Sequence, residues 1–250
     1  MIPPITPMAA TAALLLSVVA KNTFAQAAAK VYSSCIIPNT VALTFDNGPY
    51  IYMDDVVNQL KAAGAKGTFF INGYNFDCIY NSDAMKRVQH AYANGHQIAS
   101  HTWSHKDLTT LSWDQIHDEM GKVEKAIQNI TGALVAFMRP PYGSYNDLVL
   151  QAAGVRHQSV ALWDFDTGDE AGATPGQSKA AVDELIRRHP QTALVLATDT
   201  VETTVRQVLP YAIEKLQGAG YKLVTLAECL GLPAYQSVGA PSVPDGTWTC

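Results

Sequence analysis

The sequence has few charged residues, no long hydrophobic run and no glycine-rich phosphate loop. Lysine, arginine, aspartate and glutamate make up 16% of 250 residues, and the net charge of −5 leaves no basic patch for nucleic acid. The apolar run at residues 9–20 is too short to span a bilayer, and no later segment is longer. The missing loop disfavours dinucleotide binding. We therefore expect neither nucleic acid nor a membrane as a partner. We also expect the protein to be a monomer.

The composition instead fits one folded domain with a large core. Hydrophobic residues make up 48% of the chain, and a low share of charge is more typical of a secreted protein than of a disordered one. The apolar run at 9–20 precedes Ala25-Gln26-Ala27, an A-x-A cleavage pattern. We predict a signal peptide at 1–27, a domain at 28–232 and an irregular tail at 233–250. No lysine or arginine precedes the apolar run, so an uncleaved N-terminus is the alternative.

Only four cysteines are present, and none lies in a Cys-x-x-Cys metal motif. An even number after a signal peptide predicts two disulfides, for which three pairings exist. We favour Cys35–Cys229, which would tie the first strand to the last, and Cys78–Cys250, which would hold the tail. The single glycosylation sequon begins at Asn129, near the end of a predicted helix.

Seven β-rich runs alternate with helical patterns, which predicts an α/β fold with a parallel sheet. Polar residues follow many different strands, which favours a (β/α) barrel over an open sheet with one switch point. The predicted strands are 41–45, 67–71, 97–100, 135–138, 158–162, 193–197 and 222–225. The predicted helices are 53–63, 83–94, 113–130, 146–153, 177–188 and 202–217.

The first predicted strand ends at Asp46-Asn47-Gly48-Pro49, and a carboxylate at this place suits barrel chemistry. An Asx turn that merely closes the strand is the alternative. The third strand leads to His101 and His105, whose spacing would place both imidazoles on one side of a helical turn. Neutral imidazoles are common zinc ligands, although a structural hydrogen-bonding pair would have the same spacing.

Three later strands also end in polar residues. Arg139-Pro-Pro-Tyr142 follows the fourth, where the guanidinium could hold a carboxylate and the Tyr142 N–H is the first free backbone donor. A rigid surface loop is the alternative. Trp163 and the acidic segment containing Asp164 and Asp166 follow the fifth strand, and one of these carboxylates could orient Arg139. The sixth strand would bring Leu196 and Thr198 to the same mouth.

These segments together resemble the polysaccharide deacetylase family, which includes chitin deacetylases, peptidoglycan deacetylases and some acetylxylan esterases. The resemblance covers about residues 35–232, is nearest to fungal-type chitin deacetylases, and implies a distorted (β/α) barrel. The segments follow the order of the five family motifs: Asp46-Asn-Gly-Pro49, His101-x3-His105, Arg139-Pro-Pro-Tyr142, Asp166-Thr-Gly-Asp169 and Leu196-x-Thr198-Asp199.

The resemblance implies a secreted or cell-wall hydrolase that removes N-acetyl groups from chitin or a related polysaccharide with a divalent metal ion, zinc or alternatively cobalt. It makes Asp46 the catalytic base and His101, His105 and Asn47 the metal ligands. By the same resemblance, Arg139 holds the base and is itself oriented by Asp166. The Tyr142 N–H is the implied oxyanion donor, and Thr198 stands at the position of the acid. Leu196, Trp163 and Tyr142 would contact the substrate.

Three residues depart from the family pattern. Asn47 stands where most members have aspartate, although some bacterial muramic-acid deacetylases also carry asparagine. Thr198 replaces the catalytic histidine, and its hydroxyl is no acid near neutral pH, which typically costs about 10²–10⁴ in rate. Glu170 also stands where the family often has tryptophan. The alternatives are therefore a pseudoenzyme that binds chitin-like polymer, or an acetylxylan-type esterase, since an ester leaving group needs less help from an acid.

Overall fold

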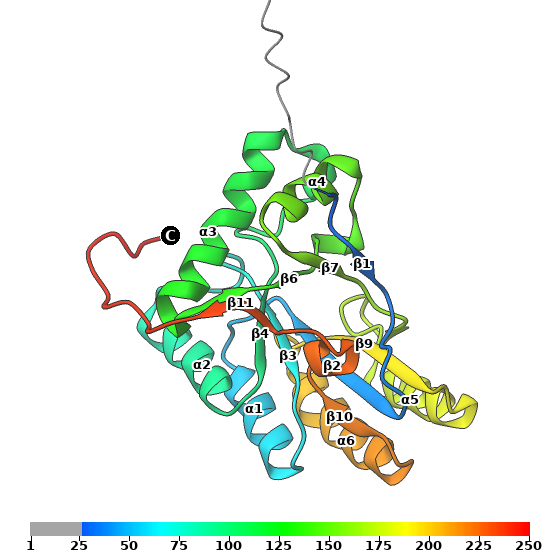
Figure 1. Cartoon of the computed structure of the whole chain (residues 1–250). Coiled ribbons are helices and arrows are strands. Elements are labelled where there is room, and N and C mark those ends of the chain that lie inside the picture. The colour runs from blue at the N-terminus through cyan, green and yellow to red at the C-terminus, as the bar shows by residue number, and fades with distance from the viewer. Residues whose placement is uncertain (1–26) are drawn as a thin grey trace, which may run out of the picture.

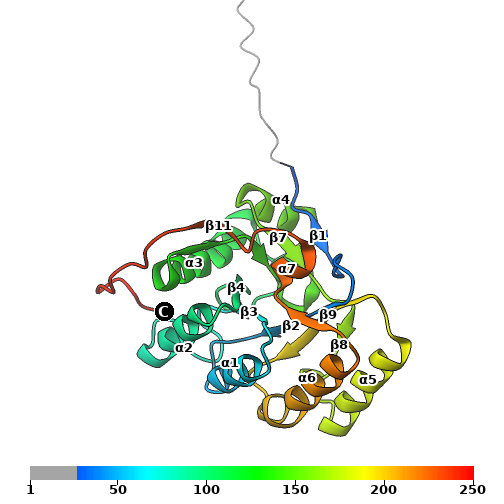
Figure 2. The ribbon, with the colours of Figure 1, turned by 60° about the horizontal axis from the view of Figure 1, so that its bottom comes forward.

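The computed structural model describes residues 27–250, so the predicted signal peptide lies outside the described residues except for Ala27. At its centre is a curled sheet in the order β1-β7-β6-β4-β3-β2-β9-β8, with β10 beside β2 (Figures 1 and 2). All pairs in this sheet are parallel. Its strands are β1 Val31–Tyr32, β2 Thr40–Asp46, β3 Thr68–Ile71, β4 Gln97–Ser100, β6 Phe137–Met138, β7 Ser159–Ala161, β8 Phe165–Asp166, β9 Thr192–Thr198 and β10 Lys222–Val224.

Helices cover the outer face of this sheet, and in Figure 2 α3, α2, α1, α6 and α5 form an arc around it. The fold is therefore the predicted distorted (β/α) barrel, left open because β1 and β8 end the path of strands. The α-helices are α1 Met53–Ala62, α2 Ser82–Ala93, α3 Trp113–Thr131, α4 Asp147–Val155, α5 Pro175–Arg188, α6 Leu209–Gly218 and α7 Leu226–Leu230. Short 3₁₀ turns lie at η1 Leu108–Thr110 and η2 Pro141–Gly143.

Strand β2 positions the site because it is paired along both edges. It lies beside β9 over its whole length, while β10 pairs with its first half and β3 with its second half. All seven residues of β2 are buried. Val41, Leu43 and Phe45 face the helical core, and Thr44 and Asp46 face the opposite side because side chains alternate along a strand. The catalytic candidate Asp46 is thus the last residue of a strand that is hydrogen-bonded to neighbouring strands on both edges.

Each of the seven predicted strands is present, but the fourth is divided. Residues Ala133–Val135 form β5, which leaves the parallel sheet and pairs antiparallel with β11, Tyr235–Val238. The prediction of an irregular tail at 233–250 was therefore wrong for β11. The pattern missed β1 and β8 because two-residue strands are too short to show alternation.

The predicted helix at 202–217 also divides. A π-helical turn, η3 Thr204–Val208, precedes α6, and Pro210 lies in the first turn of α6, where its missing N–H costs no hydrogen bond. Asn129 of the sequon lies within α3 and is buried, so the folded chain does not offer it for glycosylation.

Both predicted disulfides are confirmed. Cys35–Cys229 ties the segment before β2 to α7, and Cys78–Cys250 ties the C-terminus to the loop after β3. Trp248 packs near Tyr80, with ring centroids 5.3 Å apart. The tail is therefore held to the domain at its end.

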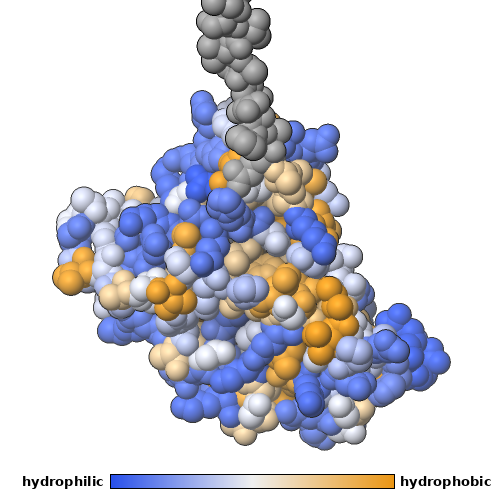
Figure 3. Space-filling view, in the orientation of Figure 1, coloured by the Kyte–Doolittle hydropathy of each residue, from blue (hydrophilic) through white to orange (hydrophobic). Residues whose placement is uncertain are grey.

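Figure 3 shows a mostly hydrophilic face with a hydrophobic patch over the region of α7. Exposed Ile36 and Ile37 lie beside this helix, since their N–H groups both donate to the Cys229 carbonyl at 2.9 Å. Within residues 27–250, no helix has the length and apolar character to cross a bilayer.

Candidate active site and metal centre

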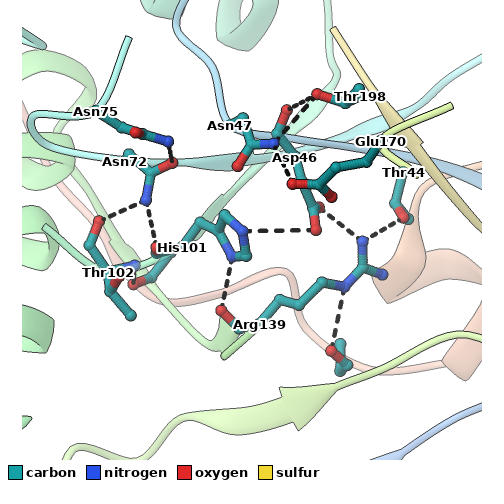
Figure 4. Close-up of polar contacts among 12 residues, drawn as sticks. Thr44, Asp46, Asn47, Asn72, Asn75, His101, Thr102, Arg139, Glu170 and Thr198 are labelled. Carbon is teal, nitrogen blue, oxygen red and sulfur yellow. Dashed lines mark hydrogen bonds and ion pairs between the residues drawn. The ribbon is translucent and has the colours of Figure 1, made fainter. Parts of the chain in front are cut away.

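The predicted catalytic residues converge at the carboxyl ends of the barrel strands. A cleft of about 280 Å³ opens there. Figure 4 shows the polar residues at its base, which come from segments far apart in the sequence. Residues that line the cleft include Asp46, His101, His105, Tyr142, Trp163, Asp166, Glu170 and Leu196.

A buried ion pair holds Asp46. Arg139 Nη1 donates to Asp46 Oδ1 at 2.7 Å and to the Thr44 hydroxyl at 2.7 Å, and the arginine is fully buried. Burial raises the pKa of Asp46 above its usual value, while the Arg139 guanidinium opposes the rise. Asp46 is thus a fixed carboxylate whose basicity exceeds that of an exposed aspartate.

The guanidinium is itself held by backbone oxygens. Its Nε donates to the Ala161 carbonyl at 3.2 Å and its Nη2 to the Leu162 carbonyl at 2.8 Å. Its central carbon lies 4.1 Å from the centre of the Phe70 ring. Arg139 therefore has one orientation, fixed by the strands on either side.

Asp166 does not hold Arg139 as the resemblance implied. Its side chain is exposed and accepts from the Gly168 N–H at 2.7 Å, and among the described residues no ion pair joins it to Arg139. Burial lowers the pKa of Arg139, and the charge of Asp166 opposes this shift less than that of Asp46 does, so Asp166 acts on the guanidinium only at longer range. Thr44 takes the orienting position instead. Sequence reasoning missed Thr44, although its two-residue spacing from Asp46 places both on one face of β2.

The two histidines meet, but on a loop and not on a helical turn. His101 follows β4, residues 101–105 form no helix, and His105 has a positive φ of 57°. Their ring centroids are 4.9 Å apart. The predicted helical turn was wrong because the irregular backbone of the loop, left-handed at Thr102 and His105, and not helical spacing, brings the rings together.

Both imidazoles are kept neutral. His101 Nδ1–H donates to the Arg139 carbonyl at 2.8 Å, which leaves the Nε2 lone pair free, 3.6 Å from Asp46 Oδ2. Burial lowers the pKa of His101 to about 3 and that of His105 to about 4. A neutral imidazole oriented through its other nitrogen is the form that binds a metal ion.

Asn47 is buried beside these groups with a positive φ of 76°. Its Nδ2 donates to Glu170 Oε1 at 3.1 Å and to Thr198 Oγ1 at 3.3 Å (Figure 4). Its Oδ1 is buried without a hydrogen-bond partner among the described residues. An unpaired buried carbonyl oxygen is costly, so its chemistry favours a cation.

The substrate-contacting candidates lie on the walls of the cleft. Tyr142 is 67% exposed and has a left-handed φ of 62°, and its N–H has no acceptor outside its own 3₁₀ turn within residues 27–250. Leu196, on β9, is buried and apolar. Trp163 packs against Gly143, where a Cβ would lie 2.9 Å from the indole Cη2. A donor, an apolar wall and an aromatic face thus surround the same space.

Comparison with known proteins decides the family. The polysaccharide deacetylase profile matches residues 35–157. A chitin deacetylase of Colletotrichum lindemuthianum is 32% identical over 205 residues, which cover 79% of this chain and 82% of that protein. The chain belongs to the polysaccharide deacetylase family. A solved structure of a chitin deacetylase from the same fungus covers 83% of this chain with a TM-score of 0.78 and 29% identity, and 94% of the solved chain is covered.

A second relative differs in length. A probable peptidoglycan-N-acetylglucosamine deacetylase of Arthroderma benhamiae is 37% identical over 227 residues, which are 88% of this chain but 51% of that protein. The chain therefore spans about half the length of this relative.

The side chains present fit a divalent metal ion with one unusual donor. Among the described residues, no three His, Cys, Asp or Glu side chains group as a metal site. Two neutral imidazoles and the unpaired Oδ1 of Asn47 would supply the three donors in this chain. Such a set carries no charge of its own, and the neighbouring carboxylate of Asp46 offsets the charge of a cation.

Two further acidic side chains, Asp169 and Asp199, are buried next to residues of the site. Asp169 accepts from the Thr198 N–H at 2.9 Å and from the Thr204 hydroxyl at 2.8 Å. Asp199 is fully buried, and burial raises its pKa well above the usual value. A Cβ on Gly48 would lie 2.7 Å from Asp199 Oδ2, which explains the glycine in the turn after Asp46.

Proposed function

We propose that this chain is a metal-dependent deacetylase that hydrolyses N-acetyl groups of chitin or chitooligosaccharides. The observation that carries the proposal is the buried Arg139–Asp46 pair, with Oδ2 of Asp46 3.6 Å from the free nitrogen of His101. A base and a metal-binding imidazole at this separation suit the activation of one water molecule. The sequence similarity to chitin deacetylases supports this class of substrate.

Each group would have a separate task. His101, His105 and Asn47 would hold a divalent ion, zinc or alternatively cobalt, which when bound supplies a Lewis acid. Asp46 takes a proton from water at Oδ2, since Oδ1 is bound to Arg139. The free Tyr142 N–H donates to the oxygen of the acetyl group as negative charge develops. Leu196 receives the acetyl methyl.

Departure of the amine is the step that the site supports least. Thr198 Oγ1 donates to the Asp46 carbonyl at 3.1 Å and accepts from Asn47, so it is a structural hydrogen-bonding group and no acid. This observation favours a second candidate, a protein that binds the polymer without turnover. It also favours esters over amides as substrates, because an alkoxide leaves with less protonation than an amine.

The experiment measures acetate released from chitin pentamer by the purified protein at saturating zinc, beside Thr198→His and the control Thr198→Val. We expect measurable release that a chelator abolishes, and an increase in the histidine variant but not in the valine variant. Native release of zero with recovery in Thr198→His establishes the binding protein instead. Release from acetylated xylan alone identifies an esterase.

Two disulfides in a chain of this size support secretion to the extracellular space or the cell wall. Residues 1–27 would be the signal peptide, residues 28–232 the catalytic domain, and the chain would act as a monomer. Mass spectrometry of the secreted protein tests the cleavage site, since an N-terminus at residue 28 is expected.

A further inference from the structure

The side chain of Asn47 is oriented by two neighbours that can only accept its hydrogens. The Glu170 carboxylate has no donor, and the single hydrogen of Thr198 Oγ1 has other acceptors in the Asp46 carbonyl at 3.1 Å and the Thr200 hydroxyl at 3.0 Å. The amide nitrogen must therefore face both of them. The carbonyl oxygen is turned to the other side, where it has no hydrogen-bond partner among the described residues.

We propose that Glu170, together with Thr198, is a positioning residue that fixes the Asn47 amide so that its carbonyl oxygen, and not its NH₂ group, is presented to a metal ion. The inference rests on the proposed function only for the presence of a metal site. An aspartate needs no such help, because both of its terminal atoms are oxygens. An asparagine needs it, since a flipped amide would direct two hydrogens at the cation.

The same contact explains why these positions depart together from the family pattern. Glu170 Oε1 lies 3.1 Å from the atom that would be a second carboxylate oxygen if residue 47 were aspartate. Two carboxylates at that distance cannot both ionise without strong repulsion. Asn47 and Glu170 are therefore compatible with each other, whereas an aspartate at position 47 would suit a neutral residue at position 170.

Direct metal binding tests the proposal without reference to turnover. Co²⁺ affinity is measured by titration of the visible absorption of the purified full chain and by competition with Zn²⁺. Glu170→Ala removes the acceptor and Glu170→Gln keeps an oxygen that accepts while removing the charge. Glu184→Gln, an exposed carboxylate on α5, serves as the control.

We expect Glu170→Ala to weaken Co²⁺ binding by about 10–100-fold, the range seen when residues that orient a metal ligand are removed. Glu170→Gln and the control are expected to stay within a few-fold of the native chain. Equal weakening in the alanine and glutamine variants would show that Glu170 acts through its charge alone, which overturns the proposal. Native affinity in Glu170→Ala, or no Co²⁺ binding to the native chain, overturns it as well.

A double-mutant cycle gives a second readout. Asn47→Asp alone is expected to leave Co²⁺ affinity at or below the native level, and Asn47→Asp with Glu170→Gln is expected to bind about tenfold tighter than the native chain, because the repulsion between the two carboxylates is then absent. Additive effects of the two substitutions contradict the coupling. The outcomes remain separate from the proposed function, since coupled metal binding without acetate release would refute deacetylation alone, and acetate release without coupling would refute this inference alone.

Discussion

Oδ2 of Asp46 and Nε2 of His101 face each other at 3.6 Å, and in the neutral tautomer of the histidine neither atom carries a hydrogen. Two lone pairs at this separation repel, so the pair favours a proton or a cation between them. Arg139 prevents Asp46 from turning away, because it holds the other carboxylate oxygen at 2.7 Å. The geometry of the site thus depends on the buried positive charge of Arg139.

Replacing Arg139 by methionine is expected to lower the free energy of unfolding by about 3–5 kcal/mol, the usual cost of leaving one buried charge without its partner. The pKa of Asp46 should rise further, since the guanidinium is the main group that lowers it. Urea unfolding at pH 7 measures the first effect. The control Arg187→Met removes an exposed ion pair on α5 and should leave unfolding unchanged. A native midpoint for Arg139→Met would contradict the assigned role.

Acid should destabilise the fold partly through His96. Its Nδ1 accepts from the Gly67 N–H at 3.1 Å, and burial lowers its pKa to about 4 from 6.5. The folded state therefore takes up a proton less readily than the unfolded chain, so stability is complete above pH 6.5 and falls as the pH drops toward 4. The expected loss from this group between pH 7 and pH 5 is about 2 kcal/mol.

The variant His96→Asn keeps an acceptor for Gly67 and removes the titration. Its free energy of unfolding should fall less than that of the native chain between pH 7 and pH 5, as followed by urea titration. Both proteins contain His101 and His105, so the acid sensitivity of those residues cancels in the difference. Parallel losses in the two proteins would rule out this role for His96.

Gly143→Ala should raise KM for the substrate, an effect that its loss of stability alone does not explain. Gly143 has a φ of +66°, and an added Cβ would lie 2.9 Å from Trp163, which must then move from the wall of the cleft. KM for chitin pentamer is expected to rise several-fold. Gly64→Ala is a matched control, because Gly64 has a φ of +64° and no atom within 4 Å of an added Cβ. Both variants should lose about 1–2 kcal/mol of stability from left-handed strain, and equal KM values would refute the role of Trp163.

The regular parts of the fold could be predicted from the sequence because alternation and helical periodicity are local. The strand ending at Asp46 has an apolar residue at every second position, and the polar turn after it marks its end. The same local logic fails for β5 and β6, where Ala136 separates two short strands that pair with different partners. Pairing of that kind is decided by tertiary contacts that no window of sequence contains.

The candidate site was predictable as a set of residues but not as a set of contacts. Motif order points to Asp46, His101 and Arg139, and all three meet in the structure. The contact between Glu170 and Asn47 joins residues 123 positions apart through a turn of irregular backbone. Neither its partner nor its distance follows from propensity, so Glu170 could be noticed in the sequence only as a departure from the family pattern.

Because β2 is paired on both edges, its amide hydrogens should exchange with solvent slowly, whereas those of the turn that carries Glu170 should exchange quickly. Amide hydrogens of β2 should exchange with solvent only when the whole molecule opens, because every residue of the strand is buried and bonded within the sheet. Glu170 lies on an exposed turn between β8 and α5, where local opening is inexpensive. Local opening of this turn would therefore release the contact between Glu170 and Asn47 while the backbone of β2 stays closed.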